Sequence, residues 1–301
     1  MTKERASDMK TANPTFSRIA KGLVPALALV LVLPLPAQTA TPKDPKSPVA
    51  GIPDGRGPTG PVTLKIVSPK GDEVIAIPPA EAGQPAATGA PVEVRVELTG
   101  YETFQDPATK AGQYVALVID NISTTFAYYD VTKPWVFKKI AKGTHMLRAF
   151  PVRPWSESLK DDAAFASVTF HVGEKDGKNL NEAGAPILTV ISPRGKVKGE
   201  AGRILLDFNV AGCPVAEKGS VPDSCRVRYK VDTQPEVTLS KKEAVWLENV
   251  TPGKHAWVVG LTREDKIVPG PYTLAQGSFE VESLVNPAAP AAAPPAKATG
   301  Q

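Results

Sequence analysis

The feature that most constrains the fold of this chain is a twofold internal repeat of short sequence blocks. The block IVSPKG at Ile66 matches VISPRG at Val190, and GTHMLRAF at Gly143 matches GKHAWVVG at Gly253. Three further pairs match: EVRVELTG (Glu93) with LLDFNVAG (Leu205), QYVALVIDN (Gln113) with CRVRYKVDT (Cys225), and VTFHV (Val168) with GSFEV (Gly277). Five matched blocks in one order, at offsets that drift only from 124 to 109 residues, indicate one structural plan built twice.

The repeated blocks alternate between apolar and polar residues with the period of a β-strand. Residues 92–99 place valine or leucine at every even position and charged or hydroxyl side chains between them. Residues 227–231 repeat the pattern, with Arg228 and Lys230 on the polar side. Because this period gives a strand one buried face and one wet face, the blocks predict antiparallel sheets. About seven short strands per copy, separated by Pro/Gly turns, predict an all-β fold of two tandem Ig-like antiparallel β-sandwiches.

Proline and glycine mark the expected domain boundaries. We expect a signal peptide at 1–40, a Pro/Gly-rich linker at 41–61, Ig-like domain 1 at 62–173, a linker at 174–185, Ig-like domain 2 at 186–283 and a disordered Pro/Ala-rich tail at 284–301. The first linker has no apolar periodicity, so we expect an extended tether. The tail has no apolar face that it could bury in a core, so we expect it to be disordered. The two bodies, of roughly 110 and 100 residues, are each long enough for a core.

The N-terminal segment has the order of a secretory signal peptide. A basic head precedes the apolar run GLVPALALVLVLPLP at Gly22, and the small-residue stretch AQTATP follows. The apolar run is about 15 residues long, against the ~20 that a spanning helix needs, although retention as an anchor is the alternative. No cysteine precedes Cys213, so no lipid can be attached at a cleavage site. These features predict an exported protein, periplasmic or extracellular, without a stable transmembrane anchor.

The charge of the chain excludes a nucleic-acid partner. The formal net charge is +4, and residues 1–40 hold five basic and two acidic side chains, so the remainder carries a charge near +1. A nearly neutral surface of mixed sign gives no electrostatic footprint for a phosphate backbone.

Four motifs of the repeat resemble those of the immunoglobulin-like and fibronectin-III-like domains of bacterial envelope and secreted proteins. These are Ser-Pro-x-Gly near the start, a strand ending in Ile-Asp-Asn or Val-Asp, Gly-x-His, and a closing Phe-x-Val. The resemblance covers residues 62–173 and 186–283. It implies a β-sandwich fold in an envelope protein and no single function, because such modules serve as binders, spacers and adhesin segments.

The histidines predict structure rather than chemistry. His145 and His255 occupy the same place in the two copies, just after a glycine turn. We interpret them as one structural corner built twice, with a ring N–H donated to a backbone carbonyl. Separate domains would keep the two rings apart, so no metal site is expected. His171 alternates with Phe170 and Val172 and is therefore expected to face solvent.

The only two cysteines, Cys213 and Cys225, bracket the loop PVAEKGSVPDS in the second copy. In an exported protein we expect them to form a structural disulfide, with a Cα spacing of about 5.5–6 Å and a stabilisation of roughly 3 kcal/mol. A redox motif would need closer spacing, and a zinc site would need two further ligands.

Aromatic loops of the first copy are the candidate ligand-binding surface. The candidate residues are Tyr128, Tyr129, Trp135, Arg153 and Trp155. Exposed aromatic rings beside an arginine stack on sugar faces or anchor a protein partner. We expect Trp155, between a proline and a serine, to be the least buried. The alternative is that these rings pack over the open end of the sandwich.

Catalytic signatures are missing from the sequence. There is no Gly-x-Ser-x-Gly, no His-Glu-x-x-His and no phosphate-binding glycine loop, so we expect no enzyme activity and no cofactor. The sequence favours an exported module that binds an envelope glycan or a protein partner through the aromatic loops. The alternative is a structural spacer or subunit of an envelope assembly. An exposed Trp155 favours binding, and a buried Trp155 favours the spacer.

Overall fold

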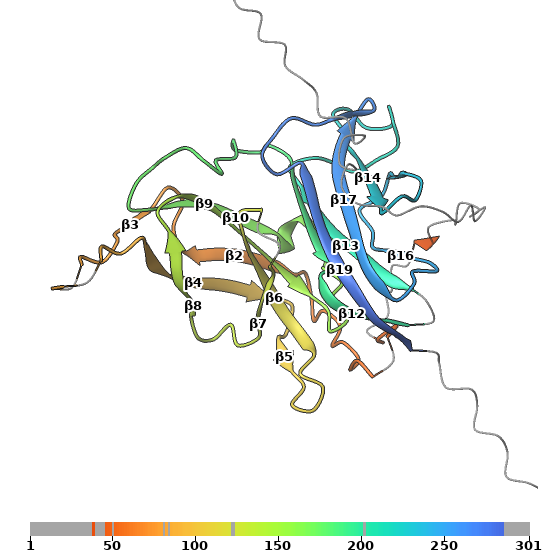
Figure 1. Cartoon of the computed structure of the whole chain (residues 1–301), viewed down its shortest axis with the longest axis horizontal. Coiled ribbons are helices and arrows are strands. Elements are labelled where there is room, and N and C mark those ends of the chain that lie inside the picture. The colour runs from red at the N-terminus through yellow and green to blue at the C-terminus, as the bar shows by residue number, and fades with distance from the viewer. Residues whose placement is uncertain are drawn as a thin grey trace, which may run out of the picture. The chain divides into compact units, whose positions relative to one another are not determined.

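The computed structural model describes residues 38–39, 46–49, 51–80, 82–83, 85–121, 124–200 and 203–285 (Figure 1). These residues belong to one compact unit, Leu35–Gln301. The predicted signal peptide, apart from residues 38–39, and the predicted tail beyond residue 285 lie outside the described residues. No helix among the described residues is long and apolar enough to cross a membrane.

The first sandwich consists of two sheets. One sheet has the order β2-β4-β8, with β2 (Thr63–Ser68), β4 (Gly89–Thr99) and β8 (Trp135–Ala141). The other has the order β3-β10-β9-β6-β5, with β3 (Val74–Ile75), β10 (Ala166–Val172), β9 (Gly143–Val152), β6 (Gly112–Ile119) and β5 (Phe104–Gln105). A further strand, β7 (Phe126–Tyr128), also pairs with β6. All pairs are antiparallel except β3 with β10.

The second sandwich repeats this plan. Its first sheet has the order β1-β16-β13-β11, with β1 (Gln38–Thr39), β16 (Val245–Leu247), β13 (Ile204–Ala211) and β11 (Ile187–Ser192). The second sheet has the order β12-β19-β17-β14-β15, with β12 (Gly195–Glu200), β19 (Leu274–Val285), β17 (Gly253–Arg263), β14 (Arg226–Val231) and β15 (Val237–Leu239). The short strand β18 (Lys266–Ile267) pairs with β17. A single 3-10 turn, Asp162–Ala164, is the only helical element among the described residues.

Two details confirm that the copies share one topology. The register between the first two strands of each sandwich shifts at the Ser-Pro motif, between Ile66 and Ser68 and between Val190 and Ser192. In each sandwich a short strand then pairs in parallel with the last strand, as β3 does with β10 and β12 with β19. The prediction of two tandem Ig-like sandwiches is therefore confirmed.

The alternating apolar positions form one core in each sandwich. The core of the first sandwich includes Val92, Val94, Val115, Leu117 and Phe170. The core of the second includes Leu206, Phe208, Val227, Trp257 and Val259. Both cores lie between the two sheets of a sandwich, as the period of two requires.

Several strands depart from the expected pattern of one wet face, among them β6, β9, β11 and β13. Strands β6 and β9 are buried along their whole length, and β11 and β13 are buried except at their last residues. The outer faces of β6 and β9 form an apolar cluster with Ile191 of β11. The β6–β9 sheet of the first sandwich therefore packs against the β11–β13 sheet of the second, and the burial of these strands on both faces has a direct cause.

The segment expected to be a tether packs along the sandwiches where it is described. Val49 and Ile52 pack against an apolar cluster that contains Trp155. The backbone N–H of Arg56 donates to the side-chain oxygen of Gln113, and that of Thr59 donates to the Gly100 carbonyl at 3.0 Å. These contacts hold residues 46–49 and 51–61 on the surface of the folded unit.

Candidate functional site

The Gly-x-His motif forms the same hydrogen-bonded corner in both sandwiches. His145 Nδ1 lies 2.8 Å from Asp120 Oδ2, and His145 Nε2 lies 2.9 Å from the Ala141 carbonyl. Asp120 Oδ1 accepts the backbone N–H of Met146 at 2.9 Å, which fixes the carboxylate against β9. The ring lies beside Phe170 of the core, at a centroid distance of 5.6 Å.

In the second sandwich His255 takes the same position. Its Nδ1 lies 2.7 Å from Asp232 Oδ2, and its Nε2 lies 2.8 Å from the Thr251 carbonyl. Phe279 lies beside the ring, at a centroid distance of 5.1 Å. Both ring nitrogens of each histidine thus lie at hydrogen-bonding distance from an oxygen atom within the corner.

The pKa of His145 is raised by this arrangement. Burial alone lowers it, but the Asp120 hydrogen bond, the Ala141 carbonyl and the negative charges of Asp120 and Asp176 outweigh burial. The charged ring is therefore favoured in the folded protein. The corner positions strands and leaves no free ring nitrogen for proton transfer or metal binding.

The expectation that His171 faces solvent is wrong. Its side chain is buried, with Nδ1 3.0 Å from Thr144 Oγ1 and Nε2 2.8 Å from Asp72 Oδ1. The reason is the short strand β3, which pairs with β10 at His171 and carries the preceding turn, with Asp72, over the outer face. In the described part of the chain, no group of three His, Cys, Asp or Glu side chains is arranged to hold a metal ion.

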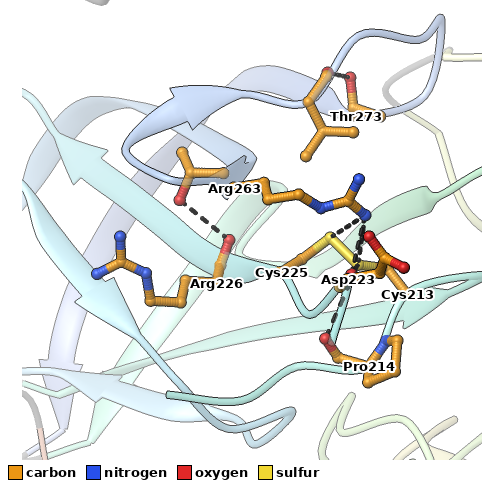
Figure 2. Close-up of a disulfide and its surroundings, with 9 residues drawn as sticks. Cys213, Pro214, Asp223, Cys225, Arg226, Arg263 and Thr273 are labelled. Atoms are coloured by element: carbon orange, nitrogen blue, oxygen red, sulfur yellow. Dashed lines mark hydrogen bonds between the residues drawn. A yellow bond between two sulfur atoms is a disulfide. The ribbon is translucent and has the colours of Figure 1, made fainter. Parts of the chain in front are cut away.

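The predicted disulfide is confirmed. Cys213 and Cys225 are bonded with a Cα–Cα distance of 6.0 Å, and Cys225 N–H donates to the Pro214 carbonyl at 2.7 Å at the base of the loop. Figure 2 shows the Arg263 guanidinium reaching over the disulfide, where its Nη2 donates to the Asp223 carbonyl at 2.9 Å. The bridge therefore closes a loop whose two arms are also tied to β17.

The aromatic candidates separate into three places. Tyr128 is buried, and its ring lies 6.0 Å from Trp135, which also contacts Phe126 and Phe137. Tyr128 OH donates to the Lys133 carbonyl. These contacts pack the Tyr128–Trp135 group over the edge of the first core, with Trp135 half-buried.

Tyr129 lies apart from that group. Its ring is half-buried against Tyr114, at a centroid distance of 5.4 Å, and its hydroxyl donates to the Lys110 carbonyl at 3.4 Å. Tyr129 and Trp135 keep partial exposure, so they are the two aromatic candidates that a ligand could still reach.

The expectation that Trp155 is the least buried aromatic residue is wrong. Only 5% of Trp155 is exposed, because it packs against Leu205, Ala244 and Trp246 of the second sandwich. Its indole N–H donates to Glu157 Oε2 at 2.7 Å, and the Arg153 guanidinium lies 5.5 Å from its ring. The structure thus brings Arg153 and Trp155 together, but at the joint between the two sandwiches.

A buried ion pair lies in the same joint. Asp207, fully buried on β13, receives the backbone N–H of Ser158 at 2.9 Å and the ammonium of Lys160 at 2.5 Å. Lys160 also donates to the Phe208 carbonyl at 2.6 Å, and Asn209 donates to the Leu159 carbonyl at 3.0 Å. Burial raises the pKa of Asp207, while Lys160 and Ser158 act in the opposite direction.

Glu157 adds a second buried carboxyl group near this ion pair. Burial raises its pKa to about 7, the Trp155 hydrogen bond lowers it, and the negative charge of Asp207 raises it further. Glu157, Lys160 and Asp207 were not among the site residues predicted from the sequence. The available signal was a pair of polar residues, Asp207 and Asn209, inside an otherwise apolar strand.

No protein-family model matches the chain, and no curated protein matches it in sequence. Among solved structures, the fibronectin(III)-like modules of CbhA from Clostridium thermocellum are similar over 73% of this chain and 95% of that chain, with 12% identity and a TM-score of 0.25.

Two further structures are similar over comparable lengths. Three N-terminal domains of the bacteriophage RB49 outer capsid protein Hoc match 74% of this chain and 70% of that chain, with 9% identity and a TM-score of 0.20. The Bacteroides ovatus protein SGBP-B, solved with a mixed-linkage heptasaccharide, matches 73% and 70%, with 10% identity and a TM-score of 0.22. At these TM-scores the likenesses add nothing to the fold that the strand order defines.

Proposed function

We propose that this protein is an exported, non-catalytic structural module of the cell envelope, in which two Ig-like sandwiches are held as one rigid body. The burial of Trp155 between the sandwiches is the observation that carries this proposal. The loop that would have offered an aromatic ring to a ligand instead contacts Leu205 and Trp246 of the second sandwich. This is the arrangement expected of a spacer or an assembly subunit.

The composition of the joint supports rigidity. Three apolar clusters cross it, centred on Trp155, on Ile191 and on the contact of Met146 with Ile187 and Tyr272. Flexibly joined domains usually meet through smaller and more polar contacts. Because polar groups such as Asp207 are satisfied across the joint, sliding of one sandwich over the other would break hydrogen bonds as well as apolar contacts.

The linker between the sandwiches is also fixed at several points. Asp176 Oδ1 accepts the Thr144 backbone N–H at 2.9 Å, and Asn179 Nδ2 donates to the Thr144 carbonyl at 3.1 Å. From the second sandwich, Tyr272 OH donates to the Asn179 carbonyl at 2.8 Å. A linker bonded to both bodies restricts their relative rotation.

The test is the rotational correlation time of each sandwich, measured by backbone ¹⁵N relaxation on the full chain. A rigid joint gives one correlation time for residues of both sandwiches. Trp155→Ala should loosen the joint and separate the two values. Trp135→Ala is the matched control, because it removes a tryptophan that packs within the first sandwich only. Two different correlation times in the unmodified protein would contradict the proposal.

The aromatic loops remain a second proposal, restricted to Tyr129 and Trp135. Their partial exposure is the observation that favours a glycan or protein partner at this surface. Titration with peptidoglycan fragments and envelope polysaccharides, followed by tryptophan fluorescence, tests it. A saturable change that Trp135→Ala abolishes supports the binding role, and no change from a folded protein counts against a glycan partner.

A further inference from the structure

A cavity of about 330 Å³ opens beside the joint, lined by residues of both sandwiches. The first sandwich contributes Asn121 and Arg148, and the second contributes Thr189, Arg194 and Trp257. Ligand sites in proteins begin at about this size and combine apolar walls with a few converging polar groups.

Arg148 is the most unusual residue of the cavity. Only 2% of it is exposed, although it carries a full positive charge. Its Nη1 donates to the Leu188 carbonyl at 3.1 Å and to Thr189 Oγ1 at 2.8 Å, and its Nη2 donates to the Asp120 carbonyl. Its buried Nε–H has no hydrogen-bond partner within the described residues. A buried donor without a partner is rare and costs free energy unless a ligand or water occupies it.

Arg194 brings a second guanidinium to the same cavity. Its Nε donates to the Val190 carbonyl at 3.0 Å, and its Nη2 donates to the same carbonyl oxygen. The Arg194 guanidinium lies 5.6 Å from the ring of Trp257, and the indole N–H of Trp257 donates to the Pro193 carbonyl at 2.9 Å. The ring and the single carbonyl hold Arg194 in place without neutralising it.

Neither of these two cations forms an ion pair with a carboxylate among the described residues. Asp120, whose carbonyl accepts from Arg148, turns its carboxylate to His145 instead. Burial lowers the pKa of each arginine to about 10. For Arg148 the nearby Tyr272 and Asp120 act in the opposite direction, and the charge of Arg194 adds to the lowering.

We propose that this cavity binds the carboxylate of a small hydroxylated acid, such as an acidic monosaccharide. An oxyanion placed between Arg148 and Arg194 would accept charge-assisted hydrogen bonds and relieve the repulsion between the two cations.

The rest of the lining suits the body of such a ligand. The amides of Asn121 and Gln276 offer donors and acceptors for hydroxyl groups, and the walls of Leu188 and Leu274 suit the apolar face of a sugar ring. Leu274 is among the exposed apolar residues, so the cavity is open to solvent on its side. This proposal is independent of the structural role proposed above, because a rigid joint needs no ligand.

The test is isothermal titration calorimetry of the full chain with galacturonate, with galactose as the neutral counterpart and inorganic phosphate as the bare oxyanion. The principal variant is Arg194→Gln. Among the described residues Arg194 forms hydrogen bonds only to the Val190 carbonyl, so its loss leaves the joint contacts of Arg148 in place. The matched control is Arg203→Gln, which removes an arginine that also lies over a tryptophan, Trp246, at 5.0 Å, but outside the cavity.

The expected result is saturable binding of galacturonate that weakens about 10- to 100-fold in Arg194→Gln, the loss that one hydrogen bond to a charged group implies. Arg203→Gln should bind as the unmodified protein does, and galactose should not bind. The proposal is overturned by an absence of galacturonate binding to the folded protein, by equal affinity for galactose or phosphate, or by an unchanged affinity in Arg194→Gln.

Discussion

At the scale of single residues, the aspartate–histidine corner occurs twice with different exposure to water. The side chain of Asp120 is 14% exposed, and that of its counterpart Asp232 is 38% exposed. Both aspartates have a positive φ, of 50° and 48°, which asparagine tolerates as well as aspartate does. Asparagine therefore removes the charge and one acceptor without adding backbone strain.

We predict that Asp120→Asn lowers the free energy of unfolding by about 1–3 kcal/mol, the usual cost of leaving buried donors unpaired. Asp232→Asn should cost less than about 1 kcal/mol, because water replaces the lost contacts. Urea denaturation of both variants measures the difference. Equal losses would mean that burial does not set the strength of the corner.

The raised pKa of Glu157 makes the stability of the folded protein depend on pH. Its pKa rises from the ordinary 4.5 to about 7 in the folded protein. Between these values the folded state binds more protons than the unfolded state, so the free energy of unfolding falls as pH rises through this window. The decrease in the free energy of unfolding that this residue causes is on the order of 3 kcal/mol, because each pKa unit corresponds to about 1.36 kcal/mol.

Glu157→Gln removes this titration and keeps an acceptor for the Trp155 N–H. We predict that the variant loses the decline in stability between pH 4.5 and 7 and is more stable than the unmodified protein above pH 7. Thermal unfolding at several pH values checks this, with Glu282→Gln as an exposed control that pairs only with Lys196. A variant with an unchanged pH profile would contradict the assignment to Glu157.

At the scale of elements, the disulfide is expected to stabilise the second sandwich through its closed loop. Replacing Cys213 and Cys225 with serine and alanine, respectively, should lower the free energy of unfolding by roughly 3 kcal/mol. Alanine is chosen at Cys225 because that residue is fully buried, whereas Cys213 is slightly exposed. Denaturant unfolding with and without a reductant measures this, and the double variant should no longer respond to the reductant. If the stability of the double variant still changed with the reductant, the effect of the reductant could not come from this disulfide.

The strands themselves show how far the sequence determines the fold. The alternating blocks predicted strands with one apolar face and a core in each sandwich, because side chains on that face must pack against the opposite sheet. The packing of one sandwich on the other was missed, although a signal existed. At the positions where β14 has Arg228 and Lys230, β6 has Ala116 and Val118, so the outer face of β6 is apolar. An uninterrupted apolar strand indicates burial on both faces.

The site residues were less predictable for a related reason. Trp155 lies in a loop, and no periodicity describes which neighbour a loop residue contacts. Arg148 and Asp207 alternate into the outer faces of β9 and β13, which the sequence alone assigns to solvent. Their burial depends on the second sandwich, and contacts between bodies far apart in sequence leave no local pattern.

The covered face of β6 can be tested by exchanging its residues with those of β14. We predict that Val118→Lys, which places a charge at a position that is 1% exposed, separates the sandwiches while leaving the first core intact. Small-angle X-ray scattering should show a larger radius of gyration, and Trp155 fluorescence should shift to longer wavelength. The reverse exchange, Lys230→Val, is the control and should change stability by no more than about 0.5 kcal/mol. An unchanged radius in Val118→Lys would contradict the packing of β6 on the second sandwich.

At the scale of the whole molecule, the joint determines whether the two sandwiches unfold together. Two lysine ion pairs cross it: Lys160 with the fully buried Asp207, and Lys242 with Asp162, whose side chain is 89% exposed. Removing one partner of a buried pair leaves an uncompensated charge and costs about 3–5 kcal/mol, whereas an exposed pair contributes about 0–1 kcal/mol. Lys160→Met should therefore split a single unfolding transition into two, and Lys242→Met should leave it single.

In Lys160→Met the unpaired buried charge of Asp207 is the expected cause of the two unfolding transitions. In the double variant Lys160→Met with Asp207→Asn both charges of this pair are removed, so no unpaired carboxylate is left at position 207. Much of the lost stability should therefore return, and the transition should become single again. Differential scanning calorimetry, comparing calorimetric with van't Hoff enthalpies, distinguishes one transition from two. If Lys160→Met still unfolds in one step, the apolar clusters alone couple the sandwiches; if the unmodified protein already unfolds in two steps, the joint does not couple them at all.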